Sequence, residues 1–114
     1  MGNVSAHDDL VLRPAMAADV PSLLDLIRGI AEYERLSQEV EATEDLLATH
    51  GFGPGRVFEA VLAERGSRAV AFALYFFTFS TFKARPTLYL EDLFMRANRA
   101  NVDAVWHVIA SDPC

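Results

Sequence analysis

The first third of the chain has apolar residues at strand spacing and then at helix spacing. Residues 10–13 predict a short strand, which Pro14 ends. Beyond it, apolar residues recur every three to four positions and predict a helix with Asp19 as N-cap and Pro21 in its first turn. We expect this helix to end near residues 33–36. Its apolar side is made of Val20, Leu23, Leu24, Ile27, Ile30 and Ala31.

The middle of the chain predicts a second helix and then a hairpin. Thr43 can cap a shorter helix that stops at Gly51, where several glycines mark a turn. Residues 57–64 and 68–79 form two strand-like runs, and only residues 65–67 separate them. So short a connection favours an antiparallel hairpin over a crossover.

The end of the second strand of this hairpin is aromatic on both faces. Tyr75, Phe76, Phe77 and Phe79 belong to it, and a loop with Phe82, Lys83, Arg85 and Pro86 follows. Such a cluster is most often core, because aromatic residues are prone to form strands and to be buried. The alternative is that Tyr75, Phe79 or Phe82 lines a pocket.

Residues 88–95 resemble a buried strand, except that Glu91 and Asp92 lie side by side within it. Successive strand residues point to opposite faces, so each face of the sheet should receive one carboxylate. Burying an unpaired ion costs several kcal/mol. Either both groups are paired with cations, or this strand lines a site at which a carboxylate has a task.

Composition indicates one soluble domain. The chain has 114 residues and is 52% hydrophobic, yet no apolar run reaches the roughly 18 residues that a membrane span needs. The one cysteine, Cys114, is the final residue, so a reducing, cytoplasmic setting is expected. His7, His50 and His107 lack ligand spacing, and we expect no metal site.

Acidic residues are concentrated between residues 19 and 45. This segment contains eight acidic residues and two arginines. Its net charge is therefore −6, the same as the net charge of the whole chain. This argues against a nucleic-acid partner and is compatible with a cationic small molecule or a basic partner. A solvated acidic helix face explains the same pattern.

Several motifs in this order resemble the GNAT superfamily of N-acetyltransferases, and within it the spermidine/spermine acetyltransferase-like branch. The resemblance covers about residues 10–95. It implies an α+β fold of the acyl-CoA N-acyltransferase type (α/β/α), with a mostly antiparallel sheet and flanking helices. The motifs are Leu12-Arg13-Pro14-Ala15, Ala31-Glu32-Tyr33-Glu34, Thr43-Glu44-Asp45-Leu46-Leu47, Gly51-Phe52-Gly53, Phe72-Ala73-Leu74-Tyr75-Phe76-Phe77-Thr78 and Leu88-Tyr89-Leu90-Glu91-Asp92-Leu93-Phe94.

The resemblance implies transfer of an acetyl group from acetyl-CoA to a primary amine of a small molecule, polyamine or amino-acid-like. By residue matching, Glu91 is the expected catalytic base, and Asp92 helps to hold the cationic substrate. Tyr33, Glu34 and Phe82 match positions near the amine pocket. The main chain of Leu93, Phe94 and Met95 is expected to bind acetyl-CoA and polarise its thioester carbonyl. Ser80 stands near a position at which polyamine enzymes carry an acid, so another amine or an amino acid is an alternative substrate.

After Met95 the chain departs from the family pattern. The family continues with Arg/Gln-x-x-Gly-x-Gly/Ala, whose main chain binds the CoA pyrophosphate, whereas no glycine follows Gly66 here. We therefore expect residues 1–95 to be the N-terminal part of a GNAT domain, truncated after its fourth strand, and residues 96–114 to be a divergent tail. Activity is expected to be impaired. Val102, Val105, Trp106 and Ile109 fall at helical spacing, so residues 101–110 predict a short amphipathic helix.

A function of another class is left open by the sequence. The chain could be a non-catalytic acidic dimerisation or amine-binding module, in which Glu91 and Asp92 face the cations of a partner. A sheet that ends at the strand of residues 88–95 leaves an exposed edge, which favours a homodimer.

Overall fold

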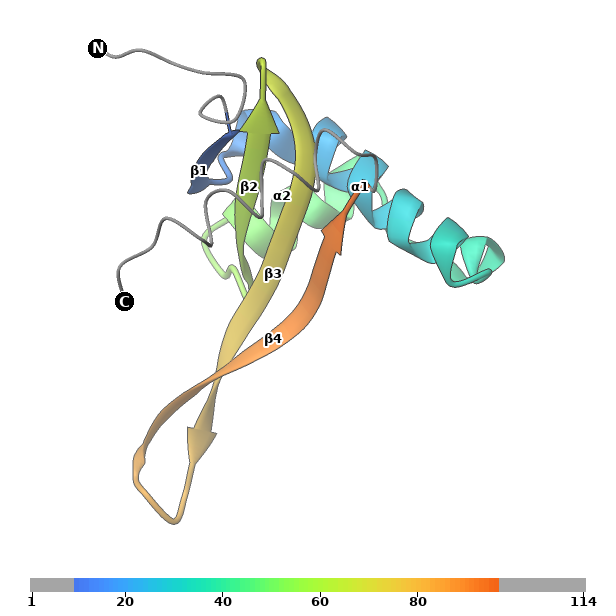
Figure 1. The fold of residues 1–114 in the computed structure, drawn as a ribbon. Coiled ribbons are helices and arrows are strands. Elements are labelled where there is room, and N and C mark those ends of the chain that lie inside the picture. The colour runs from blue at the N-terminus through green and yellow to red at the C-terminus, as the bar shows by residue number, and fades with distance from the viewer. Residues whose placement is uncertain (1–9, 97–114) are drawn as a thin grey trace, which may run out of the picture.

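A computed structural model of the chain describes residues 10–96. Every helix and strand predicted for this part of the chain is present, with bounds shifted by a few residues (Figure 1). In order, the elements are β1 (Leu10–Pro14), the 3-10 turn η1 (Ala17–Asp19), α1 (Val20–Tyr33), the 3-10 turn η2 (Ser37–Glu39), α2 (Glu44–Phe52), β2 (Glu59–Arg65), β3 (Arg68–Ser80) and β4 (Arg85–Met95). The predicted helix at residues 101–110 lies outside the described residues.

The four strands form one antiparallel sheet in the order β1-β2-β3-β4. In the β2–β3 hairpin, Arg65 lies opposite Arg68, and the two residues between them, Gly66 and Ser67, have φ of 60° and 69°. Two successive positive φ angles define a type I′ turn, whose twist matches that of the strands it joins. The predicted hairpin and the predicted α+β fold class are therefore confirmed.

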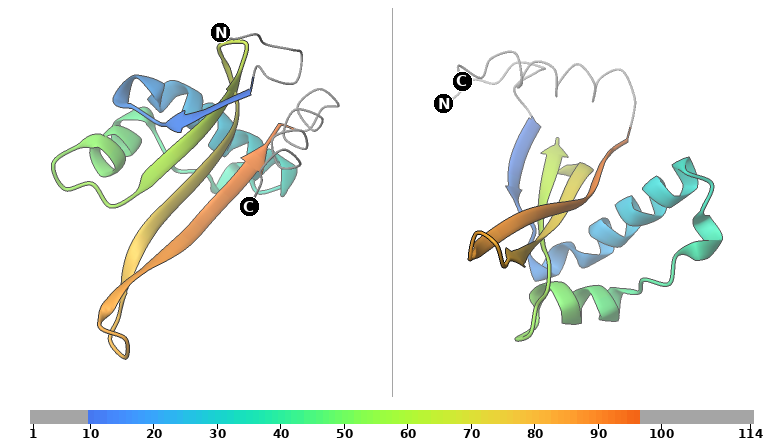
Figure 2. Two further views of the ribbon diagram at one scale, coloured as in Figure 1. Left: turned by 60° about the vertical axis from the view of Figure 1, so that its left-hand side comes forward. Right: turned by 90° about the horizontal axis from the view of Figure 1, so that it is seen from below.

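Both helices cover the same face of the sheet (Figure 2). The main core joins α1 to β2 and β3 through Leu23, Leu26, Ala60, Leu62 and Phe72, all nearly or fully buried. A smaller cluster of Val20, Leu24 and Leu47 joins α1 to α2. Full burial of one such leucine or phenylalanine contributes about 1.5–3 kcal/mol, so these contacts fix α1 on the sheet. Within residues 10–96, no helix is long and apolar enough to cross a membrane.

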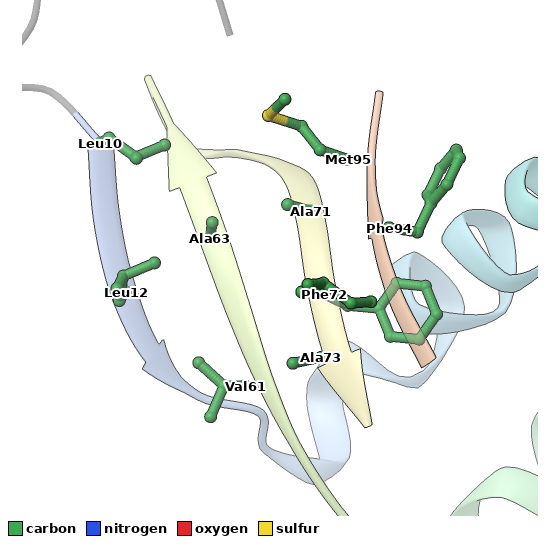
Figure 3. Close-up of a pocket in the computed structure, with 10 residues that line it drawn as sticks. Leu10, Leu12, Val61, Ala63, Ala71, Phe72, Ala73, Phe94 and Met95 are labelled. Carbon is green, nitrogen blue, oxygen red and sulfur yellow. The ribbon is translucent and has the colours of Figure 1, made fainter. Parts of the chain in front are cut away.

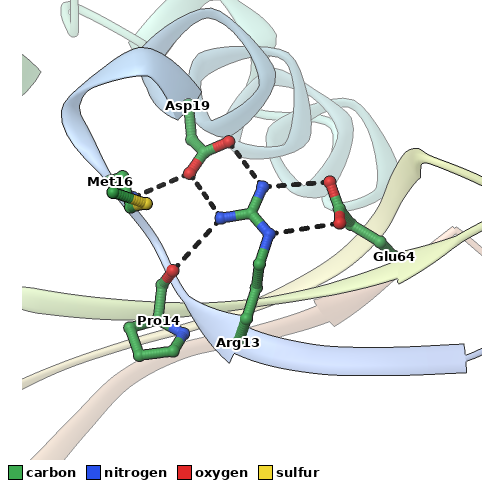
Figure 4. A network of polar contacts seen from close by, with 5 residues as sticks. All are labelled: Arg13, Pro14, Met16, Asp19 and Glu64. Carbon is green, nitrogen blue, oxygen red and sulfur yellow. Dashed lines mark hydrogen bonds and ion pairs between the residues drawn. The ribbon is translucent and has the colours of Figure 1, made fainter.

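A three-residue ion network joins β1, η1 and β2 (Figure 4). Arg13 donates to both carboxylate oxygens of Asp19, each at 2.7 Å, and to both of Glu64, at 2.9 and 3.1 Å. These bonds hold the pKa of both carboxyl groups below their usual values. Asp19 precedes α1 as predicted but does not cap it through its side chain. Instead it accepts a hydrogen bond at 2.7 Å from the backbone N–H of Met16, which is the N-cap of η1.

The β3–β4 hairpin projects well beyond the helices as an arm (Figure 1). Arg85 and Pro86, which were expected in a loop, belong to β4, because Ser80 pairs with Arg85 and the chain turns within residues 81–84. Ring stacking of Phe76 on Tyr89, with centroids 5.0 Å apart, joins the two strands of the arm.

Two expectations about burial are wrong for this arm. The aromatic end of β3 is not core, since Phe77 and Phe79 are more than half exposed. The strand of residues 88–95 is not buried either. It is the edge strand β4, and about half or more of Leu88, Tyr89, Leu90 and Leu93 is exposed. The local sequence pattern predicted the strand correctly. Burial of a strand, however, depends on whether another layer covers it, and the helices do not extend along the arm.

Candidate functional site

The inner end of β4 is fixed to helix α1 by two contacts. Arg96 Nη2 donates to Asp25 Oδ2 at 2.6 Å. One turn further along the helix, the ring of Phe94 lies against Gly29, where a Cβ atom would be 3.0 Å from Phe94 Cε2. Glycine at this position therefore lets β4 approach the helix closely.

These contacts show that α1 and β4 are antiparallel to each other. The helix segment from Asp25 to Glu34 and the strand segment from Arg96 to Asp92 have equal lengths. From Asp25 to Glu34 the helix rises about 13 Å at 1.5 Å per residue. From Arg96 back to Asp92 the strand covers about 13 Å at 3.3 Å per residue. The end of α1 therefore reaches the level of Asp92, and Glu34 acts on Asp92 electrostatically.

Helix α1 ends in a motif that fixes the position of Glu34. Arg35 has a left-handed φ of 61°, its N–H donates to Glu32 O at 3.0 Å, and the N–H of Leu36 donates to Ala31 O at 2.7 Å. This pair of bonds is a Schellman motif, which satisfies carbonyl groups that the helix end leaves open. Glu34 is thereby held at the negative end of the helix dipole, where an acid is electrostatically unfavourable.

A β-bulge lies in β4 at the predicted catalytic residue. Asp92 pairs with Leu74 and Leu90 pairs with Tyr75, so Glu91 is an extra residue without a partner in β3. The strict alternation that was expected to send Glu91 and Asp92 to opposite faces is therefore interrupted. The expected burial of both carboxylates is also wrong, because Glu91 is exposed and Asp92 is partly buried.

The electrostatic environment of Asp92 is wholly unfavourable for its charge. Burial raises the pKa of Asp92 above its usual value, and the negative charges of Glu91 and Glu34 raise it further. Among residues 10–96, the ion pairs involve Arg13, Arg56 and Arg96, and none of them includes these three carboxylates. Such a cluster is suited to a cation that comes from outside the described part of the chain.

Two other predicted substrate residues differ in how they relate to this cluster. Tyr33, the last residue of α1, is adjacent to Glu34 and 81% exposed. Phe82 lies at the tip of the arm and is fully exposed. The β4 segment from Arg85 to Asp92 alone spans about 23 Å. The fold thus brings Glu34, Glu91 and Asp92 together with Tyr33 nearby, and it does not bring Phe82 to them.

The predicted cofactor residues Leu93, Phe94 and Met95 follow the bulge at the edge of the sheet. Phe94 packs toward the core, with its ring centroid 6.5 Å from that of Phe72, whereas Leu93 is 70% exposed. Within residues 10–96, β4 pairs only with β3, so its outward N–H and C=O groups have no strand partner. Free main-chain N–H groups beside a carboxylate cluster are what polarisation of a thioester carbonyl requires.

Sequence reasoning missed the features that assemble this site. The bulge at Glu91 has no local signature, and the Asp25–Arg96 pair joins residues far apart in the chain. Gly29 did offer a signal, because a glycine inside a helix costs about 1 kcal/mol relative to alanine and indicates a packing reason. Within residues 10–96, no group of three or more His, Cys, Asp or Glu side chains is arranged to hold a metal ion.

Several known proteins are similar to this chain in sequence or in fold. No family model matches the chain. It is 36% identical over 95 residues to a thialysine N-epsilon-acetyltransferase of Bos taurus, covering 76% of this chain and 55% of that protein. It is 34% identical over 98 residues to a spermidine/spermine N(1)-acetyltransferase-like protein 1 of Homo sapiens, covering 80% of this chain and 14% of that protein. The chain spans about half the length of the thialysine acetyltransferases that it matches.

Solved structures show the same fold. An aminoglycoside acetyltransferase from an uncultured soil metagenomic sample superposes with a TM-score of 0.66 over 93% of this chain and 71% of that one, at 13% sequence identity. At that identity the likeness concerns the fold alone, while the relatives above carry the sequence relationship. Together they confirm the predicted resemblance. In sequence and in fold, the chain therefore resembles the GNAT superfamily of N-acetyltransferases.

Proposed function

We propose that Glu34, Glu91 and Asp92 receive the primary amine of a small molecule, to which the acetyl group of acetyl-CoA is transferred. The observation that carries this proposal is the convergence of three carboxylates at the negative end of α1, with a raised pKa for Asp92. A bound ammonium group would remove their mutual repulsion. Relatives named for thialysine and spermidine/spermine acetylation support the same class of substrate.

The chemistry needs an acceptor for a proton. A primary amine with a pKa near 10.4 is almost fully protonated at neutral pH, and its nitrogen has no free lone pair in that form. Asp92 and Glu34 hold the ammonium group, and Glu91 takes one proton from it through water. The neutral nitrogen attacks the thioester carbonyl, the C–N bond forms, the C–S bond breaks, and the second nitrogen proton passes to the departing thiolate.

Around Leu93, Phe94 and Met95, the main-chain N–H groups that point away from β3, those of Leu93 and Met95, donate to the carbonyl oxygen while it carries negative charge. Their position directly after the bulge supports this role, because the carbonyl carbon must lie within reach of an amine held at Asp92. These residues are the part of the acetyl-CoA site that falls within residues 10–96. The predicted loss of the glycine-rich loop concerns residues after Met95 and reduces the affinity expected for acetyl-CoA.

The amine is a polyamine or a lysine-like amino acid in this proposal, since three carboxylates can neutralise more than one positive charge. We also infer a homodimer. Phe82 can flank the amine only if the arm of a second copy brings it to the carboxylates, because its own chain holds it far away. A cytoplasmic location agrees with a single cysteine per chain.

Calorimetric titration of the full chain tests this function in two steps. Spermidine or thialysine is titrated first, then acetyl-CoA, and turnover is followed with both present. We expect amine binding that Glu91→Gln weakens little, and turnover that the same change lowers by at least tenfold. Glu39→Gln, an exposed acid outside the cluster, is the control. Heat from the amine without heat from millimolar acetyl-CoA would instead support an amine-binding module.

Light scattering at micromolar concentration tests the dimer. The twofold mass of one chain is expected, and Phe82→Ala should weaken amine binding in the dimer. A monomer that retains full amine affinity would contradict the shared site.

A further inference from the structure

The tip of the arm carries the one lysine of the chain, Lys83. The turn that holds it is closed, because Ser80 pairs with Arg85 and the backbone N–H of Lys83 donates to Ser80 Oγ at 3.3 Å. Lys83 is exposed, and it follows Phe82, which is fully exposed. The arm therefore presents an aromatic ring and a primary amine at neighbouring positions, far from the helices (Figure 1).

The arm and the carboxylate cluster of Glu34, Glu91 and Asp92 have opposite charge. The hairpin contains no acidic residue from Ala69 to Leu90, and both basic residues of this range, at positions 83 and 85, lie at or beside the tip. Complementary charge favours contact between the tip of one chain and the carboxylates of another.

The carboxylates of its own chain are out of reach for Lys83. The β4 segment from Arg85 to Asp92 spans about 23 Å, and the four-carbon stem of a lysine is much shorter than that. A second copy removes this limit, because its carboxylates can lie against the tip. The same arrangement brings Phe82 to the amine site, as the proposed homodimer requires.

One side of the arm is apolar and supports contact with a second copy. Phe77 pairs with Leu88 across the hairpin, Phe79 pairs with Pro86, and both phenylalanines and Leu88 are more than half exposed. At the base of the arm this side continues as an apolar hollow of about 420 Å³, which Ala73 lines on β3 (Figure 3). Within residues 10–96 no helix covers it (Figure 2). So large an apolar surface is unfavourable in water, and burial against another chain relieves the cost.

We propose that Lys83 of one copy is acetylated in the amine site of a second copy, at Glu34, Glu91 and Asp92. This inference rests on the proposed acetyl transfer and adds a protein lysine to its substrates. Water carries one ammonium proton of Lys83 to Glu91 of the second copy. The neutral Nζ attacks the thioester carbonyl, the C–N bond forms and the C–S bond breaks. The second nitrogen proton passes to the departing thiolate, so the products are an acetylated lysine and CoA.

Incubation of the full chain with acetyl-CoA, in the absence of a free amine, tests this proposal. Because Lys83 is the one lysine, peptide mass spectrometry assigns the acetyl group directly. We expect acetylation of Lys83 that is at least tenfold slower in Glu91→Gln and at least tenfold slower with saturating spermidine, which competes for the same carboxylates. Glu39→Gln, an exposed acid outside the cluster, is the control and should keep the full rate.

A mixing experiment tests transfer between copies. Glu91→Gln chains, which retain Lys83, are labelled with ¹⁵N and mixed with unlabelled Lys83→Arg chains, which retain Glu91. We expect the labelled chains to be acetylated at least tenfold faster in the mixture than alone. Equal rates in the mixture and alone would overturn the proposal.

Free thialysine in the same preparation separates this proposal from the proposed function. Acetylated thialysine beside an unmodified Lys83 would overturn the proposal and leave the proposed function in place. If neither amine is acetylated, both are wrong. Acetylation of Lys83 at a rate that neither Glu91→Gln nor spermidine changes would be a spontaneous reaction with acetyl-CoA, and it would also overturn the proposal.

Discussion

Phe94 on β4 lies so close to Gly29 on α1 that a Cβ atom at position 29 would be 3.0 Å from Phe94 Cε2. This contact, between the Asp25–Arg96 ion pair and the carboxylate cluster, sets how near the end of α1 comes to the bulge in β4. The three carboxylates are therefore brought together by the packing of a helix on an edge strand.

Gly29→Leu should disrupt this contact. A leucine side chain cannot fit beneath Phe94, and overpacking of this kind costs about 1–3 kcal/mol of the free energy of unfolding. Because Phe94 and Asp92 share a strand, we also expect weaker amine binding. Urea denaturation and calorimetry measure the two effects. Ser22→Leu, on the exposed side of the same helix, is the control. Unchanged stability and affinity would mean that β4 does not depend on this contact.

Arg35→Gly should stabilise the protein by about 0.5–1 kcal/mol. Arg35 has a φ of 61°, a conformation that glycine adopts without the steric cost that a side chain incurs. Arg28→Gly is the matched control in the helix interior, and it should destabilise by about 1 kcal/mol. Thermal denaturation distinguishes the two signs. A lower melting temperature for Arg35→Gly would contradict the observed end of α1.

Arg13→Gln should lower stability at neutral pH and leave it nearly unchanged in acid. Arg13 lowers the pKa of Asp19 and Glu64, so its contribution is present above their ordinary pKa values near 4. It is lost as the pH falls through the still lower values of the folded state. Urea denaturation across this range provides the measurement. A loss that is equally large in strong acid would show that the arginine acts through packing rather than charge.

Asp92→Asn should have the opposite dependence on pH. The pKa of Asp92 is raised on folding, so its ionisation opposes folding, and this cost appears as the pH rises through the raised value. The variant should gain stability at neutral pH and gain none below pH of about 4. The gain should stay under about 1 kcal/mol, because solvent screens a partly exposed carboxylate. Glu39→Gln is the control, and an equal gain from it would contradict a specific cluster.

Much of the fold could be predicted from the sequence because its signals are local. The spacing of Leu23, Leu24 and Ile27 predicts α1, and the short connection through Gly66 predicts the β2–β3 hairpin. Burial could not be predicted in the same way. Leu88, Leu90 and Leu93 are as apolar as core residues, yet β4 is an edge strand that no described layer covers along most of its length.

The candidate site was identified by family resemblance, and its geometry was not predictable from the residues. Nothing near Glu91 in the sequence indicates a bulge, which arises from the register between β3 and β4. The approach of Glu34 to Asp92 follows from equal lengths of helix and strand beyond the Asp25–Arg96 pair. Both features depend on tertiary packing, so local sequence patterns do not predict them.

The most direct test of the cation site is the pKa of the Asp92 carboxyl group, followed by ¹³C NMR during a pH titration of the full chain. We predict a value above the ordinary range for aspartate in the free protein, a lower value in Glu34→Gln, and a fall when spermidine or thialysine is added. An ordinary pKa for Asp92 that neither Glu34→Gln nor a saturating amine changes would contradict the proposal that these carboxylates form one site for a cationic substrate.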